Sequence, residues 1–163
     1  MKYLVLLLLI GCASPVIQDE IYSRSMNPTQ VSALISDRIE PRNINLFFSD
    51  ESYTVFANRS YFRAILDDYR KHSFNSGVRY SKRYDCEDFA RGMQHFFQVR
   101  YGKSKHRGQS FALGVANYRT DEGFNHSLCI ALIGDEVLFI EPQKGFFVEL
   151  SKKERKSLLS VNF

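Results

Sequence analysis

The sequence predicts an α+β fold, in which helices come first and an antiparallel sheet follows. Before about residue 102, most apolar residues recur at the three- and four-residue spacing of helices. After that point they alternate with a period of two, which is typical of strands. Gly134-Asp135 separates two alternating runs and is typical of a two-residue hairpin turn. The 163 residues are enough for one domain with a buried core.

The first predicted helix covers residues 28–39. Asn27 is suited to cap it, Pro28 fits its first position, and Pro41 ends it. Its apolar face is formed by Val31, Leu34, Ile35 and Ile39. A short strand, Tyr53–Phe56, is expected after it.

Two longer helices are predicted next. One runs from a cap at Asn58 or Ser60 to about Lys71, and the other begins at or just after Cys86 and ends near Gly102. The second has a buried face formed by Phe89, Met93, Phe96 and Phe97.

Strands are predicted in the rest of the chain, in the segments QSFALGVANY, NHSLCIALI, EVLFIEP and GFFVEL. Ser151 and Glu154 have the three-residue spacing of a capping box, which predicts a short final helix.

Residues 1–11 have the features of an export signal, because one positive residue precedes an apolar run and small residues. The run is too short to span a bilayer permanently. Its end, Leu9-Ile10-Gly11-Cys12, resembles the lipobox of bacterial lipoproteins, in which the chain is cut before the cysteine and the thiol receives a lipid. The resemblance implies that Cys12 is the lipidated first residue, and Ala13 after it favours the outer membrane, facing the periplasm. A plain secretory signal with an incidental cysteine is the alternative.

Residues 12–26 are polar and lack an apolar period, so they are expected to form a lipidated tether before a domain of residues 27–163. The formal net charge of +4 is a weak bias and does not indicate a nucleic-acid partner.

Cys86 and Cys129 remain once Cys12 is assigned to a lipid, and they either pair or have separate roles. Cys86 stands in the segment Asp85-Cys86-Glu87-Asp88, at the start of a predicted helix. Backbone N–H groups and the helix dipole stabilise a thiolate there, whereas the carboxylates oppose it. Cys86 is therefore the candidate nucleophile.

A thiol nucleophile needs a base, and the base needs an orienting partner. With the hairpin turn above, His126 faces Gln143 on the next strand and lies diagonally from Glu141, on the same face of the sheet. Cys129 points to the other face, where we expect a buried apolar side chain. A Cys86–Cys129 disulfide in a non-enzymatic domain is the alternative.

The segment DCEDFA (residues 85–90), His126 on a downstream strand, and Glu141-Pro142-Gln143 resemble the motifs of the papain/transglutaminase-like cysteine hydrolases. Two branches are most similar: the bacterial transglutaminase-like cysteine proteinases and the papain-like C-terminal domain of fungal agglutinins. The resemblance covers about residues 80–149 and implies that the nucleophile helix packs on an antiparallel sheet. The implied site consists of Cys86 as nucleophile, His126 as base and acid, Glu141 as orienting residue and Gln143 as supporting or oxyanion residue.

In both branches, acidic residues beside the cysteine bind calcium, an ion that prefers oxygen ligands. The resemblance therefore makes Asp85, Glu87 and Asp88 candidate calcium ligands. The alternative is that they complement the dipole of the helix.

The resemblance and the lipobox together imply a lipid-anchored envelope cysteine hydrolase. It would act as a peptidase on an envelope protein or peptide through an acyl-thioester, with no cofactor required for the chemistry. Acyl transfer to an amine fits the same residues. Two other functions stay open: a non-enzymatic envelope lipoprotein that binds a partner, and a cell-wall peptidase or amidase.

Overall fold

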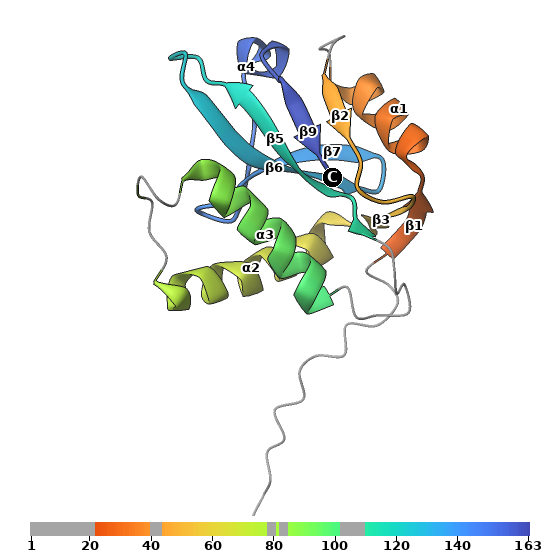
Figure 1. Ribbon diagram of the computed structural model, residues 1–163. Helices are drawn as coiled ribbons and strands as arrows, with labels where there is room; N and C mark the ends of the chain where they lie inside the picture. Colours follow the sequence, from red (N-terminus) through yellow and green to blue (C-terminus); the bar gives the residue numbers. More distant parts are fainter. Residues whose placement is uncertain (1–21, 40–43, 78–80, 82–84, 102–109) are drawn as a thin grey trace, which may run out of the picture.

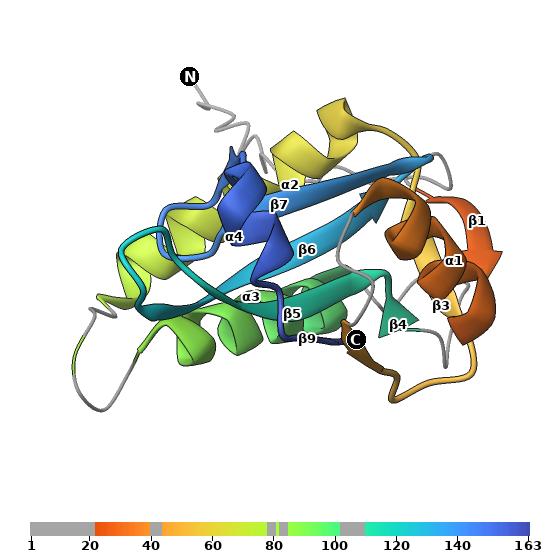
Figure 2. The ribbon, with the colours of Figure 1, turned by 90° about the horizontal axis from the view of Figure 1, so that it is seen from above.

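The computed structural model describes residues 22–39, 44–77, 81, 85–101 and 110–163. Its elements, in chain order, are β1 (Tyr22–Met26), α1 (Pro28–Arg38), β2 (Asn45–Phe47), β3 (Tyr53–Phe56), α2 (Arg59–Ser76), α3 (Cys86–Tyr101), β4 (Ser110–Phe111), β5 (Leu113–Arg119), β6 (Asn125–Ile133), β7 (Glu136–Glu141), β8 (Phe146–Val148), α4 (Lys152–Lys156) and β9 (Ser160–Asn162). Over these residues the strands form one mixed sheet. Helices α2 and α3 cover one face of it, and α1 packs on the other (Figures 1 and 2).

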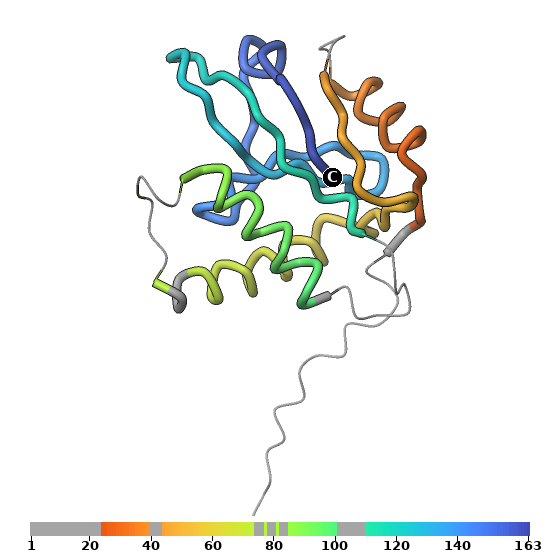
Figure 3. Tube along the Cα trace, viewed as in Figure 1, coloured from red at the N-terminus to blue at the C-terminus, as the bar shows by residue number. Residues whose placement is uncertain are grey.

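The sheet has the strand order β1-β3-β6-β5-β9-β2, with β7 and β8 continuing from β6, and β4 pairing with β3. Strands β5 to β8 pair antiparallel. Strand β3 is parallel to β4 and β6, and β2 is parallel to β9. The last strand, β9, lies between β5 and β2, which brings the C-terminus into the sheet (Figure 3).

The helices begin where the sequence offers caps. The Asn27 side chain accepts a hydrogen bond from the Gln30 amide, and the Gln30 side chain accepts one from the Asn27 amide. Asn58 caps α2 by accepting a bond from the Tyr61 amide. These bonds satisfy amides that the first turn of a helix leaves without partners. The caps predicted at Asn27 and at Asn58 are confirmed.

The core lies on both faces of β6, whose residues alternate between two apolar clusters. On one face, β6 contributes Leu128, Ile130 and Leu132 to a cluster that includes Val31 and Ile35 of α1. On the other face, it contributes Cys129, Ala131 and Ile133 to a cluster with Ala90, Met93 and Phe97 of α3. Helix α3 is thereby held against the centre of the sheet.

The prediction of an antiparallel sheet that follows the helices is wrong in two respects. Strands β1, β2 and β3 precede or separate the helices, and three of the strand pairs are parallel. A parallel pair needs a long connection, and the chain between β3 and β6 supplies one that contains α2, α3, β4 and β5. Strand β1 also falls within residues 12–26, which the sequence analysis assigned to the tether. Its pairing with β3 moves the start of the domain to Tyr22 or earlier.

Candidate functional site

His126 and Glu141 form the hydrogen bond that strand pairing predicts. Strands β6 and β7 are joined by the predicted two-residue turn, with Ile133 opposite Glu136 and Cys129 opposite Ile140. His126 Nε2 lies 3.1 Å from Glu141 Oε2, and both side chains are mostly buried. The pair fixes the orientation of the imidazole ring.

The turn after β7 holds the Glu141 carboxylate in place. The Gln143 amide donates to Glu141 Oε1 at 3.1 Å, while the Gly145 amide donates to the Glu141 carbonyl at 2.7 Å. Gly145 has a φ of +62°, a conformation that glycine adopts without strain. Gln143, predicted as a supporting residue, therefore contacts Glu141 through its backbone.

The pKa of Glu141 is lowered in the folded protein. Burial raises this pKa, but the hydrogen bonds from His126 and from the amide of Gln143 outweigh burial, and electrostatic interactions with His126 and Lys144 add to them. Glu141 is accordingly ionised at neutral pH and holds His126 by a charge-assisted bond.

Cys86 is the first residue of α3 and is partly exposed. The preceding residue, Asp85, caps the helix: its Oδ1 accepts bonds from the amides of Glu87 at 3.0 Å and Asp88 at 3.4 Å. In turn, the Asp88 carboxylate accepts a hydrogen bond from the Asp85 amide at 3.0 Å. This reciprocal arrangement sets the start of the helix at the thiol.

The acidic residues around Cys86 have structural roles, which supports the helix-dipole interpretation over calcium. Asp85 and Asp88 cap the helix, and Glu87 pairs with Arg91 one turn later, at 2.7 Å. In the part of the chain that the structure describes, no group of three or more His, Cys, Asp or Glu residues is placed to hold a metal ion. The calcium prediction for Asp85, Glu87 and Asp88 has no support there.

Tyr118 on β5 is a site residue that the sequence analysis missed. It pairs directly with His126 across β5 and β6, and the two rings meet edge-on with centroids 5.7 Å apart. Burial and the negative charges of Glu154, Glu141, Cys86 and Glu122, in that order, raise the pKa of Tyr118 to about 12. The Tyr118 phenol therefore lies beside the imidazole of His126 and within the electrostatic influence of Glu141 and Cys86. The signal that could have found it is the β5–β6 register, which needs the length of the loop between them.

Cys129 has the buried role that was predicted for it. Both Cys86 and Cys129 are free thiols, so the alternative of a disulfide between them is wrong. The Cys129 thiol donates to the Ala90 carbonyl of α3 at 3.4 Å, and burial raises its pKa far above the ordinary range. Because the thiol form is so strongly favoured, Cys129 is inert packing beneath α3.

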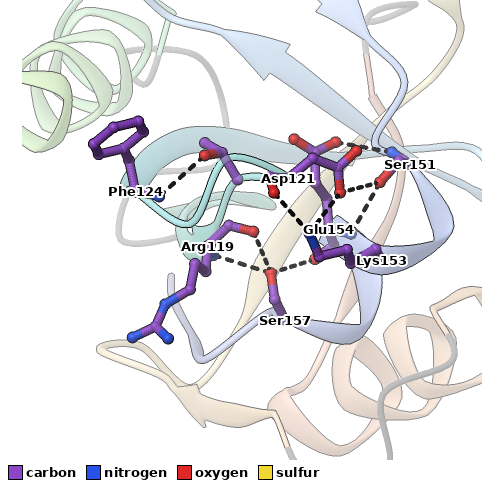
Figure 4. Close-up of polar contacts among 8 residues, drawn as sticks. Arg119, Asp121, Phe124, Ser151, Lys153, Glu154 and Ser157 are labelled. Carbon is purple, nitrogen blue, oxygen red and sulfur yellow. Dashed lines mark hydrogen bonds and ion pairs between the residues drawn. The ribbon is translucent and has the colours of Figure 1, made fainter.

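The hairpin that carries Tyr118 and His126 is tied to α4 (Figure 4). The Ser157 hydroxyl accepts a bond from the Arg119 amide at 3.0 Å, and the Ser151 hydroxyl bonds to Asp121 at 3.0 Å. Glu154 completes the capping box predicted with Ser151, accepting from the Ser151 amide at 2.9 Å. These bonds hold Glu154 close enough to Tyr118 for its charge to act on the phenol.

Two further parts of the predictions concern the membrane. Cys12 and the signal of residues 1–11 lie outside the described residues. Among the residues that are described, no helix combines the length and the hydropathy needed to cross a membrane.

Comparison with known proteins gives the fold. No protein-family model and no curated protein matches the sequence. Two solved structures are similar over 85% of this chain at 20% identity. One is described as a PSL1a–E64 complex, with a TM-score of 0.66. The other is Polyporus squamosus lectin bound to the human-type influenza-binding epitope Neu5Aca2-6Galb1-4GlcNAc, with a TM-score of 0.64. The chain spans about half of each of these longer chains.

This comparison contradicts the predicted fold family and the function that was inferred from it. One of the matched chains is described as a lectin, and the fold shared with the two chains replaces the predicted papain/transglutaminase-like fold. The predictions of a cysteine hydrolase, of peptidase or acyl-transferase activity and of the cysteine-protease class are corrected on the same ground. They rested on short motifs around Cys86, His126 and Glu141, and those motifs alone do not establish a reaction.

Proposed function

We propose that this chain is a lipid-anchored protein of the bacterial envelope whose folded domain binds a ligand without transforming it. The observation that carries the proposal is the fold shared with two chains that are described with bound ligands, E64 and a sialylated glycan epitope. The match covers half of those chains, so the ligand of this protein is inferred from its own site.

The proposed binding site is the group formed by Tyr118, His126 and Glu141, which meet across β5, β6 and β7. His126 is held by Glu141 at 3.1 Å, so its imidazole is presented in one orientation. Tyr118 adds a hydroxyl donor. Such a set of donors suits a ligand rich in carbonyl or hydroxyl oxygens.

A binding experiment tests this function directly. Titration calorimetry would measure the dissociation constants of E64 and of the trisaccharide Neu5Aca2-6Galb1-4GlcNAc. We expect the wild type to bind at least one of them, and His126→Ala to bind it about tenfold more weakly, because a hydrogen-bonding ring nitrogen is lost. His95→Ala is the matched control, since His95 is an exposed histidine of α3. It should bind like the wild type.

Cys86→Ala separates binding from covalent chemistry. Binding without reaction needs no thiol, so this variant should keep its affinity within about threefold. An E64 adduct on the wild type, seen as a gain in intact mass that Cys86→Ala lacks, would overturn the proposal. Failure of the wild type to bind either probe would also overturn it.

The lipid anchor is tested separately. In a bacterial host supplied with radiolabelled palmitate, the full chain should become labelled and partition into detergent. Cys12→Ser should lose both properties, because it lacks the thiol that would carry the lipid. The control is Cys86→Ser, which should label like the wild type. Equal labelling of wild type and Cys12→Ser would rule out the anchor.

A further inference from the structure

We infer that the Tyr118 hydroxyl is a specificity-determining contact that donates a hydrogen bond to a neutral oxygen of the bound ligand. The inference deepens the proposed binding function and rests on it. Tyr118 lies on the same sheet face as His126, because the two residues are directly paired on β5 and β6. Its ring contacts the imidazole edge-on, with centroids 5.7 Å apart. A ligand that reaches His126 would therefore also lie beside Tyr118.

The hydroxyl of Tyr118 is available to a ligand. Only 6% of the residue is exposed, yet its hydroxyl bonds to no residue in the described part of the chain. Across the same residues, no side-chain nitrogen or oxygen is both fully buried and unpaired. The hydroxyl must therefore reach accessible surface. A nearly buried ring with an unpaired, accessible hydroxyl is a rigid donor whose bond is left for another molecule.

The charges around Tyr118 select the kind of oxygen that it can bind. Burial and the charges of Glu154, Glu141, Cys86 and Glu122 raise its pKa to about 12, so the hydroxyl keeps its proton at neutral pH and donates. The carboxylates of the three glutamates repel an anionic group at short range. The acceptor that fits is a neutral oxygen, either an amide carbonyl or a sugar hydroxyl.

Tyr118→Phe is the test, because it removes only the hydroxyl. Calorimetry would measure binding of two probes: E64, and the uncharged disaccharide Galb1-4GlcNAc. We expect Tyr118→Phe to bind about tenfold more weakly whichever of the two probes the wild type binds. Binding of E64 would indicate an amide carbonyl as the acceptor, and binding of Galb1-4GlcNAc would indicate a sugar hydroxyl. The melting temperature should stay within about 1 °C of the wild type, because the hydroxyl has no partner to lose within the protein.

Tyr53→Phe is the matched control. The buried Tyr53 hydroxyl accepts a bond from the Asp50 amide at 2.8 Å, so its loss should lower the melting temperature and leave the affinity unchanged. If the wild type binds and Tyr118→Phe binds equally well, the role of Tyr118 is overturned and the proposed function stands. If the wild type binds none of E64, the trisaccharide and Galb1-4GlcNAc, both the role of Tyr118 and the proposed function are overturned. Tighter binding of the acidic trisaccharide than of Galb1-4GlcNAc would contradict the selection of a neutral oxygen.

Discussion

Replacing Phe56 with alanine should lower the free energy of unfolding by about 3 to 5 kcal/mol, the usual cost of removing a buried aromatic ring. Phe56 is completely buried between the sheet and the helices α2 and α3. The centroid of its ring lies 4.6 Å from the ring centroid of Phe62, 5.3 Å from that of Phe111 and 5.8 Å from that of Phe97. Phe56→Ala therefore loses stability for two reasons, because it removes buried apolar surface and because it removes favourable ring contacts.

Urea denaturation followed by circular dichroism would measure this loss. A domain of this size has about 5 to 15 kcal/mol of stability, so the variant should unfold at much lower urea or not fold at all. Phe56→Leu fills part of the cavity and should lose less. The matched control is Phe124→Ala, since Phe124 is 71% exposed and should change stability by less than about 0.5 kcal/mol. A cost below about 1 kcal/mol for Phe56→Ala would contradict the core described above.

The sequence predicted those elements of the fold that have a local cause. The strand Tyr53–Phe56, the start of α3 at Cys86 and the hairpin at Gly134-Asp135 follow from residue spacing and turn chemistry. Pairing between distant segments has no such local signal. Strands β2 and β9 have three residues each and gain their stability from each other, with Asn45 opposite Ser160. Neither segment shows an alternating apolar pattern by itself, so neither was predicted.

The same distinction applies to the site. The His126–Glu141 contact was predictable, because one short turn fixes the register of both residues. Tyr118 was not, because the loop of residues 120–124 sets its register with His126, and that loop is closed by bonds between Thr120 and Phe124. The alternative roles of Asp85 and Asp88, as calcium ligands or as helix caps, also required coordinates. Both roles use the same residue types at the same spacing.

Replacing Glu141 with glutamine should make the protein less stable at neutral pH, and this difference should shrink in acid. Burial raises the pKa of Glu141, but the bonds from His126 and the Gln143 amide outweigh burial, so the pKa is lowered in the folded protein. A lowered folded-state pKa means that the ionised carboxylate stabilises the fold above the unfolded pKa of about 4.5. That stabilisation is lost as the pH falls through the folded pKa, where the wild type also becomes neutral.

Urea unfolding at pH 7 and at several values below 4.5 would measure the effect. At pH 7 the variant should lose about 1 kcal/mol, near the lower end for a bond to a charged group because the carboxylate is partly exposed. Glu149→Gln is the matched control, since Glu149 is exposed and should show the same small difference at every pH. A loss for Glu141→Gln that stays constant from pH 7 into acid would show that the charge does not contribute. The Glu141 side chain would then stabilise the fold through its shape and hydrogen bonds, which the amide of the variant reproduces incompletely at every pH.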